Sequence, residues 1–107
     1  MKVNNIFETI PHRLDRELVE SLVENKDISI ERIISKGHVS PASDWYDQPN
    51  NEWVIVLKGE AVITFQDGTE LRLPAGSYID IPAHKKHRVN WTDPEHETVW
   101  LAVHYPP

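Results

Sequence analysis

The sequence has no cysteine at any of its 107 positions. Disulfide bonds, thiolate–zinc centres and a cysteine nucleophile are therefore all excluded, and the composition is compatible with a reducing cytoplasm. No apolar run approaches the ~20 residues that a membrane helix needs, and the start of the chain has no apolar stretch of signal-peptide length. The sequence thus predicts a cytoplasmic protein without a membrane partner.

Positive charge is also scarce. Lys and Arg number 11 against 17 Asp and Glu, which gives a formal net charge of −6. Binding to nucleic acid phosphates needs a basic surface, so the charge balance argues against nucleic acid as a partner. The length fits one domain with one hydrophobic core.

One segment, residues 12–25, has the apolar spacing of an amphipathic helix. In HRLDRELVESLVEN the apolar side chains fall at i, i+4, i+5, i+8 and i+9, which forms one stripe of a helix. Asp15 can serve as the N-cap and Asn25 as the stop. We therefore predict an N-terminal extension with one α-helix over residues 1–26, ahead of the main domain over residues 27–107.

From residue 27 onward the chain is a series of short β-type runs separated by turn signals. Asp67-Gly68 is a two-residue hairpin signal, because both central positions favour positive φ. The runs are DISIERIIS, WVIVL, EAVITFQ, TELRL, SYIDI, KHRVNW and ETVWLAVHY. Several strands at this spacing, with no helix between them, predict an all-β sandwich or a closed barrel.

Two spaced motifs accompany these strands. In the first, EWVIVLKGEA, six residues separate Glu52 from Gly59. In the second, five residues separate Gly76 from Pro82, and IPAHKKHRVNW then places His84 and His87 three positions apart.

These motifs resemble those of the cupins, small β-barrels that often hold a metal ion in the barrel mouth. The resemblance covers about residues 28–105 and implies a double-stranded β-helix (cupin, or jelly-roll) barrel. The second cupin motif matches well, although His84 stands where the family has a turn glycine. The first motif matches in its C-terminal half only, because neither position of its H-x-H holds a histidine.

The register of the first motif has two alternatives. With a three-residue gap before Glu52, the histidine positions hold Tyr46 and Gln48. With a four-residue gap they hold Trp45 and Asp47. We prefer the first, since a proline commonly follows the second histidine in cupins and a proline follows Gln48 here.

The resemblance implies that Gln48, Glu52 and His87 bind a divalent metal ion (iron, manganese, nickel or zinc). Imidazole and carboxylate groups suit such metals, and the glutamine adds a neutral oxygen. Tyr46 and His84 are the candidate catalytic groups, the latter because the pKa of histidine lies near neutrality. The open alternative is a metal-free barrel in which Glu52 and His87 hydrogen-bond each other or water.

Three further residues are candidates for a substrate pocket. Trp91 lies four positions after His87, and so on the same face of a regular strand. His104 lies on the last strand, and alternation alone leaves open whether it faces the interior. Asp47 is the candidate if the other register of the first motif holds.

Lys85, Lys86 and Arg88 form a basic cluster in an acidic protein. They are either a solvated strand edge, where lysine also discourages pairing between sheets, or a collar that attracts an anionic substrate. Of the two, we favour the solvated strand edge.

Trp53, Ile55 and Leu57 have the opposite parity to Glu52. If Glu52 faces inward, these side chains form an outward apolar row, which the N-terminal helix or a second subunit would cover. Since cupins are often dimers, we predict a homodimer.

The predicted function is that of a small single-domain cupin with a metal ion in the barrel. It would act on a small organic molecule, anionic if the basic cluster is a collar, by dioxygenase, isomerase or lyase chemistry, and the fold does not choose among these. The alternative is a metal-free cupin that binds a small molecule or regulates without catalysis.

Overall fold

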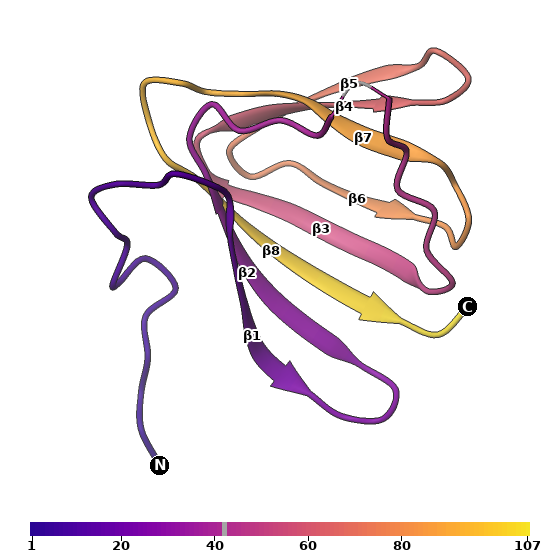
Figure 1. Cartoon of the computed structure of the whole chain (residues 1–107). Helices are drawn as coiled ribbons and strands as arrows, with labels where there is room; N and C mark the ends of the chain where they lie inside the picture. Colours follow the sequence, from indigo (N-terminus) through magenta and orange to yellow (C-terminus); the bar gives the residue numbers. More distant parts are fainter. Residues whose placement is uncertain (42) are drawn as a thin grey trace.

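The computed structural model describes residues 1–41 and 43–107, and these form two antiparallel sheets (Figure 1). The first sheet has five strands in the order β1-β2-β8-β3-β6, and the second has three in the order β5-β4-β7. The bounds are β1 Leu18–Glu24, β2 Ser29–Ser35, β3 Asn51–Lys58, β4 Glu60–Phe65, β5 Glu70–Pro74, β6 Tyr78–Ile81, β7 His87–Thr92 and β8 Thr98–Tyr105.

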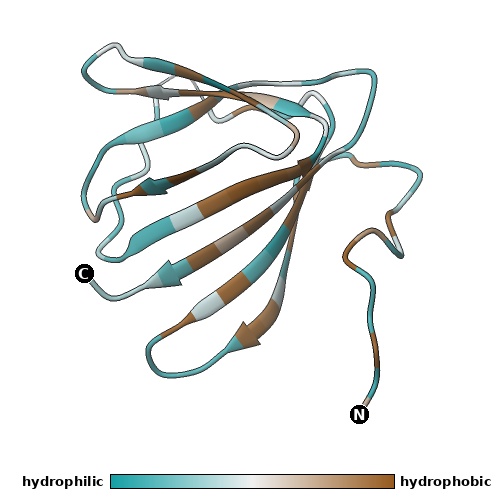
Figure 2. Ribbon diagram, turned by 180° about the vertical axis from the view of Figure 1, so that it is seen from behind, coloured by the Kyte–Doolittle hydropathy of each residue, from teal (hydrophilic) through white to brown (hydrophobic). Residues whose placement is uncertain are grey.

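The hydrophobic core lies between the two sheets. Val54, Val56 and Trp100 from the larger sheet pack with Ile63 and Phe65 from the smaller one. Figure 2 shows hydrophobic and hydrophilic residues interchanging along the strands of the larger sheet, as expected where one face of a sheet is buried. The seven predicted β-runs correspond to β2 through β8, so the all-β prediction is confirmed.

The turn between β4 and β5 forms at the predicted hairpin signal. Gly68 has a φ of 93°, and the Thr69 amide donates to Asp67 Oδ1 at 2.9 Å. The Phe65 amide donates to the Thr69 carbonyl at 2.8 Å and closes the loop. These bonds fix the register of β4, which carries part of the cavity wall described below.

The predicted N-terminal helix was wrong, because residues 18–24 form the edge strand β1 instead. Val19 and Val23 lie opposite Ile33 and Ile30 of β2, so β1 satisfies backbone groups that β2 would otherwise leave open. Tertiary pairing therefore overrides the helical spacing of the apolar residues. The described part of the chain holds no helix long and apolar enough to cross a membrane.

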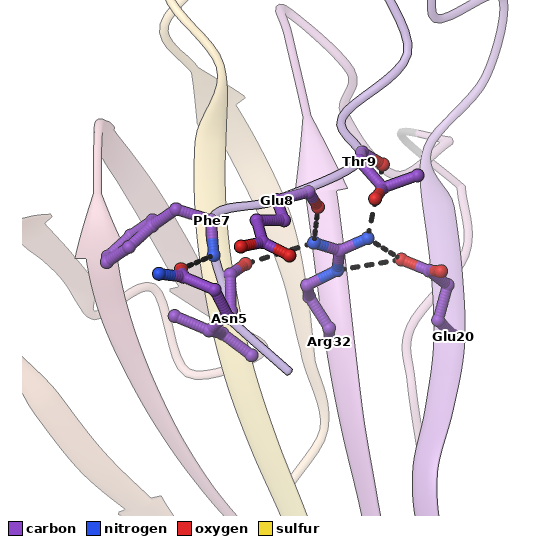
Figure 3. Close-up of polar contacts among 7 residues, drawn as sticks. Asn5, Phe7, Glu8, Thr9, Glu20 and Arg32 are labelled. Atoms are coloured by element: carbon purple, nitrogen blue, oxygen red, sulfur yellow. Dashed lines mark hydrogen bonds and ion pairs between the residues drawn. The ribbon is translucent and has the colours of Figure 1, made fainter. Parts of the chain in front are cut away.

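The segment before β1 is held on the outer face of the larger sheet by one arginine. Arg32, in β2, is only 5% exposed and donates to the carbonyls of Ile6 at 3.0 Å, Glu8 at 2.5 Å and Thr9 at 3.4 Å. It also forms an ion pair with Glu20 of β1. Figure 3 shows the guanidinium reaching both the N-terminal segment and β1. This guanidinium therefore links the N-terminal segment to β1.

The outward apolar row predicted for β3 lies opposite apolar residues of β8. Trp53 pairs with Val103 and Ile55 with Leu101, and the Trp53 ring lies 5.5 Å from that of Tyr78. All but Tyr78 are half-buried. Packing within the sheet covers much of this row. The homodimer stays a prediction.

Candidate functional site

A cavity of about 150 Å³ lies between the two sheets. Its walls are mostly apolar, with Val54 and Trp100 from the larger sheet facing Ile63 and Val89 from the smaller one. The titratable side chains that line it are Glu17, Glu31, Tyr46, Glu52, His87 and His104. An apolar pocket with a few convergent polar groups is the usual form of a small-molecule site.

Glu52 and His87 form the polar centre of this cavity. Glu52 Oε1 lies 3.5 Å from His87 Nε2, and the two side chains are only 13% and 7% exposed. His87 Nδ1 donates to the Lys85 carbonyl at 2.8 Å, which turns the other ring nitrogen toward Glu52. The strands supply the remaining alignment, since Glu52 lies opposite His104 in β8 and His87 lies opposite Phe65 in β4.

Gln48 and Tyr46 complete this centre from the loop before β3. Gln48 Nε2 donates to Glu52 Oε1 at 3.4 Å. Tyr46 lines the cavity, and its amide donates to the His87 carbonyl at 2.8 Å. Trp45 and Asp47 do not line the cavity, so the structure agrees with the three-residue gap in the first motif.

The pKa of His87 is raised above its ordinary value of 6.5. Burial by itself lowers it, but the hydrogen bond to Glu52, the Lys85 carbonyl and the charge of Glu52 together outweigh burial. The environment therefore favours the protonated form of His87, whose second N–H is directed at a carboxylate. Such a group can act as a general acid.

This shift predicts a pH-dependent contribution to stability. Because the pKa is higher in the folded state, the stabilisation is fully present below about pH 6.5 and is lost as the pH rises through the folded pKa. Between about pH 6 and pH 9, we expect the Tm of the wild type to fall relative to that of His87→Gln, which does not titrate. Thermal unfolding across this range measures the difference. His96→Gln, which changes an exposed histidine, should follow the wild type, and parallel curves for wild type and His87→Gln would contradict the assignment.

A second carboxylate–imidazole pair faces the same cavity. His104 Nε2 lies 2.9 Å from Glu31 Oε1, and both residues line the cavity. The question that alternation left open for His104 is thus answered, because β8 lies in the middle of the larger sheet with this side chain inward. Glu31 was not predicted from the sequence. It lies two positions before Ile33 in β2, and so on the same face, and both residues line the cavity.

Glu17 is another cavity residue that the sequence did not reveal. It precedes β1, inside the segment predicted as a helix, and accepts a hydrogen bond from the buried Ser35 at 2.9 Å. Burial raises its pKa, and repulsion from Glu52 adds to the effect, although the Ser35 bond and His38 oppose them. Ionising Glu17 in this cavity therefore costs free energy.

His84 lies outside the cavity lining, in the turn before β7. Its φ of 63° is left-handed, which explains why cupins have a glycine at this position. The His84 amide donates to the Gln48 carbonyl at 2.8 Å, and its Nδ1 lies 2.7 Å from Asp47 Oδ1. This exposed pair joins the turn to the loop that carries Gln48, so the structure does not bring His84 and Asp47 to the polar centre.

Trp91 does not share the face of His87. The register of β7 against β4 shifts by one residue, so that Val89 lies opposite Ile63 but Trp91 lies opposite Val62. One extra residue on a strand reverses the alternation beyond it. Trp91 therefore faces outward, where the Arg72 guanidinium lies 5.8 Å from its ring centroid.

The basic cluster also lies away from the cavity. Lys85 Nζ contacts Asp67 at 3.3 Å, and the Arg88 guanidinium lies 4.6 Å from the centroid of the Trp45 ring. Neither residue lines the cavity, and nor does Lys86. The arrangement fits the first interpretation of the cluster, a solvated strand edge.

The donor set at the polar centre fits a divalent cation, though only with three side chains. Glu52 Oε1 lies 3.5 Å from His87 Nε2 and 3.4 Å from the Gln48 amide, and ligand atoms about 2.1 Å from one ion stand ~3.4 Å apart in a tetrahedron. Gln48 would have to turn its amide to present oxygen. Among the described residues no three His, Asp or Glu side chains are grouped for a metal, so an ion would have two strong donors and one weak one.

Comparisons with known proteins agree with this architecture. Residues 32–104 match the family model described as a cupin domain, and the chain therefore belongs to the cupin family. No curated protein matches the chain.

Solved structures resemble the chain over its whole length. A putative mannose-6-phosphate isomerase from Ralstonia eutropha JMP134 is 42% identical, with a TM-score of 0.95 and full coverage of both chains. A conserved protein of unknown function from Streptococcus pyogenes is 25% identical, with a TM-score of 0.77, and the match covers 99% of this chain and 88% of that one. An RmlC-like cupin from Desulfovibrio desulfuricans has a TM-score of 0.79 at 20% identity, covers 100% of this chain and 98% of its own, and shows the fold alone.

Proposed function

We propose that this cupin binds a small organic molecule in the cavity between its sheets and that Glu52 and His87 engage it. The observation that carries the proposal is the buried Glu52–His87 pair at a cavity of about 150 Å³ with mostly apolar walls. Burying a carboxylate and an imidazole costs free energy unless they are paired, so a pair that opens on a cavity is a functional candidate.

The pair can move a proton on a bound molecule. When protonated, His87 can donate its Nε2 proton to a ligand oxygen, while Glu52 can accept one from a neighbouring carbon or hydroxyl group. Gln48 orients Glu52 through its amide, and Tyr46 lies beside His87 with ring centroids 5.7 Å apart. Isomerase and lyase reactions both need such transfers, and the fold does not choose between them.

A divalent metal ion is a second candidate component of the same site. Gln48, Glu52 and His87 would hold it, and the anchoring of His87 Nδ1 on the Lys85 carbonyl is typical of a histidine that ligates a metal. Such an ion would supply a Lewis acid to a ligand oxygen. His87 would then be neutral and could not act as the proton donor at Nε2.

The description of the Ralstonia protein raises mannose 6-phosphate as a ligand for this chain. A phosphate monoester is anionic, and the described lining has three carboxylates and no lysine or arginine. We therefore do not extend that substrate to this cavity.

The test combines metal analysis with fragment binding. Protein purified without an affinity tag is assayed for metals, dialysed against a chelator and screened by thermal shift against organic fragments of about ten heavy atoms or fewer, the size that such a cavity takes. We expect at least one fragment to raise the Tm of the wild type in a saturable way and to lose this effect in Glu52→Gln and His87→Gln. His96→Gln is the matched control.

The outcomes separate the two forms of the proposal. Near-stoichiometric metal that is lost in Glu52→Ala and His87→Ala supports the metal component. Metal-free protein that takes up no ion on dialysis removes that component and leaves ligand binding. If neither a metal ion nor any fragment binds, the proposed function is overturned.

A further inference from the structure

The charge of the cavity lining is unbalanced. Glu17, Glu31 and Glu52 line it, whereas no lysine or arginine among the described residues does. The two imidazoles are each beside one carboxylate, His87 at 3.5 Å from Glu52 and His104 at 2.9 Å from Glu31. Even with both imidazoles protonated, Glu17 remains without an ionic partner in the lining.

The apolar walls strengthen this imbalance. Charges act over longer distances when low-dielectric groups surround them, and the apolar side chains of Val54, Ile63 and Val89 line the same cavity as these carboxylates. Burial is the first cause of the raised pKa of Glu17, and repulsion from Glu52 makes a smaller contribution. An anionic ligand would add to the repulsion.

Trp100 adds an aromatic wall to the cavity. It lines the cavity and is 3% exposed. An indole ring in a cavity wall attracts cations through its π-face.

We propose that the cavity selects a small organic cation, namely a primary ammonium compound about the size of one aromatic ring. This inference rests on the proposed function and adds to it the charge of the ligand. Glu31 and Glu17, on the wall opposite the smaller sheet, receive the ammonium group, and Trp100 packs against the organic part. A cavity of about 150 Å³ holds one such ring.

Three probes of nearly equal size and different charge test the proposal. Benzylamine, benzyl alcohol and benzoate are titrated into the chelator-dialysed full chain at pH 7, and binding is followed by calorimetry and by the indole N–H resonances in NMR. We expect benzylamine to bind at least about tenfold more tightly than benzyl alcohol, since a charge-assisted hydrogen bond supplies that factor. Benzoate should bind more weakly than both.

Two cavity variants test which carboxylates cause the preference for benzylamine. Glu31→Gln and Glu17→Gln keep the size and shape of the side chains but remove their charge and replace one acceptor oxygen with an amide donor, and each should reduce the advantage of benzylamine about tenfold. Glu70→Gln, which changes an exposed carboxylate of β5, should leave it unchanged.

The result also separates this inference from the function on which it rests. If benzoate binds as tightly as benzylamine, or if both cavity variants keep the wild-type preference, selection of a cation is overturned while small-molecule binding stands. If none of the three probes binds, the inference is again overturned, and the fragment screen decides the proposed function by itself.

Discussion

Gly59→Ala is expected to prevent folding or to lower the free energy of unfolding by more than about 4 kcal/mol. Gly59 lies between β3 and β4 with a φ of 86°. A Cβ there would lie 2.6 Å from Thr98 Cα and 2.8 Å from the Glu97 carbonyl oxygen. These are backbone atoms at the start of β8, so they cannot move without shifting the strand that carries Trp100. Expression in soluble form and urea unfolding measure the effect.

Gly68→Ala is the matched control for this prediction. Gly68 has a similar φ of 93°, but a Cβ there would meet nothing within 4 Å. Its substitution should cost only the left-handed backbone strain, about 1–2 kcal/mol. Similar losses in the two variants would show that the backbone clash at Gly59 is not the cause.

Arg32→Ala is expected to lower the free energy of unfolding by about 3 kcal/mol and to release the N-terminal segment. The substitution removes the donor that Ile6, Glu8 and Thr9 share and leaves Glu20 without its ion pair. Urea unfolding measures the loss of stability. Limited trypsin digestion should cut the variant faster after Arg13, because the preceding segment is no longer held on the sheet.

Arg72→Ala provides the comparison for Arg32. Arg72 also forms an ion pair, with Glu60, but its side chain is 70% exposed. Exposed pairs contribute between about 0 and 1 kcal/mol, so this variant should resemble the wild type in both stability and digestion. An Arg32→Ala protein that is digested no faster than Arg72→Ala would contradict the anchoring role.

The strands and the polar centre were predictable from local sequence. Each of β2 to β8 is a run of β-formers bounded by a turn signal, and that information lies within a few neighbouring residues. Glu52 and His87 were found because their distances from Gly59, Gly76 and Pro82 are those of the cupin motifs. The structure brings these two side chains to within hydrogen-bonding reach of each other.

The other cavity residues could not be found in this way. Trp91 was placed on the face of His87 because regular alternation was assumed, and one shifted residue in β7 reversed its direction. Glu17 lay in a segment whose apolar spacing suggested a helix. Its place in the cavity depends on the pairing of β1 with β2, which the helical spacing of the apolar residues does not indicate.

Strand period, turn chemistry and motif spacing are local properties, and from these we predicted an all-β cupin with Glu52 and His87 at its centre. Strand pairing in the folded chain places residues 18–24 in an edge strand, turns Glu17, Glu31 and His104 toward the cavity, and keeps Lys85 and Arg88 out of its lining. The direction of a side chain in a sheet follows from register and bulges, which depend on the partner strands and not on the residues of one strand alone.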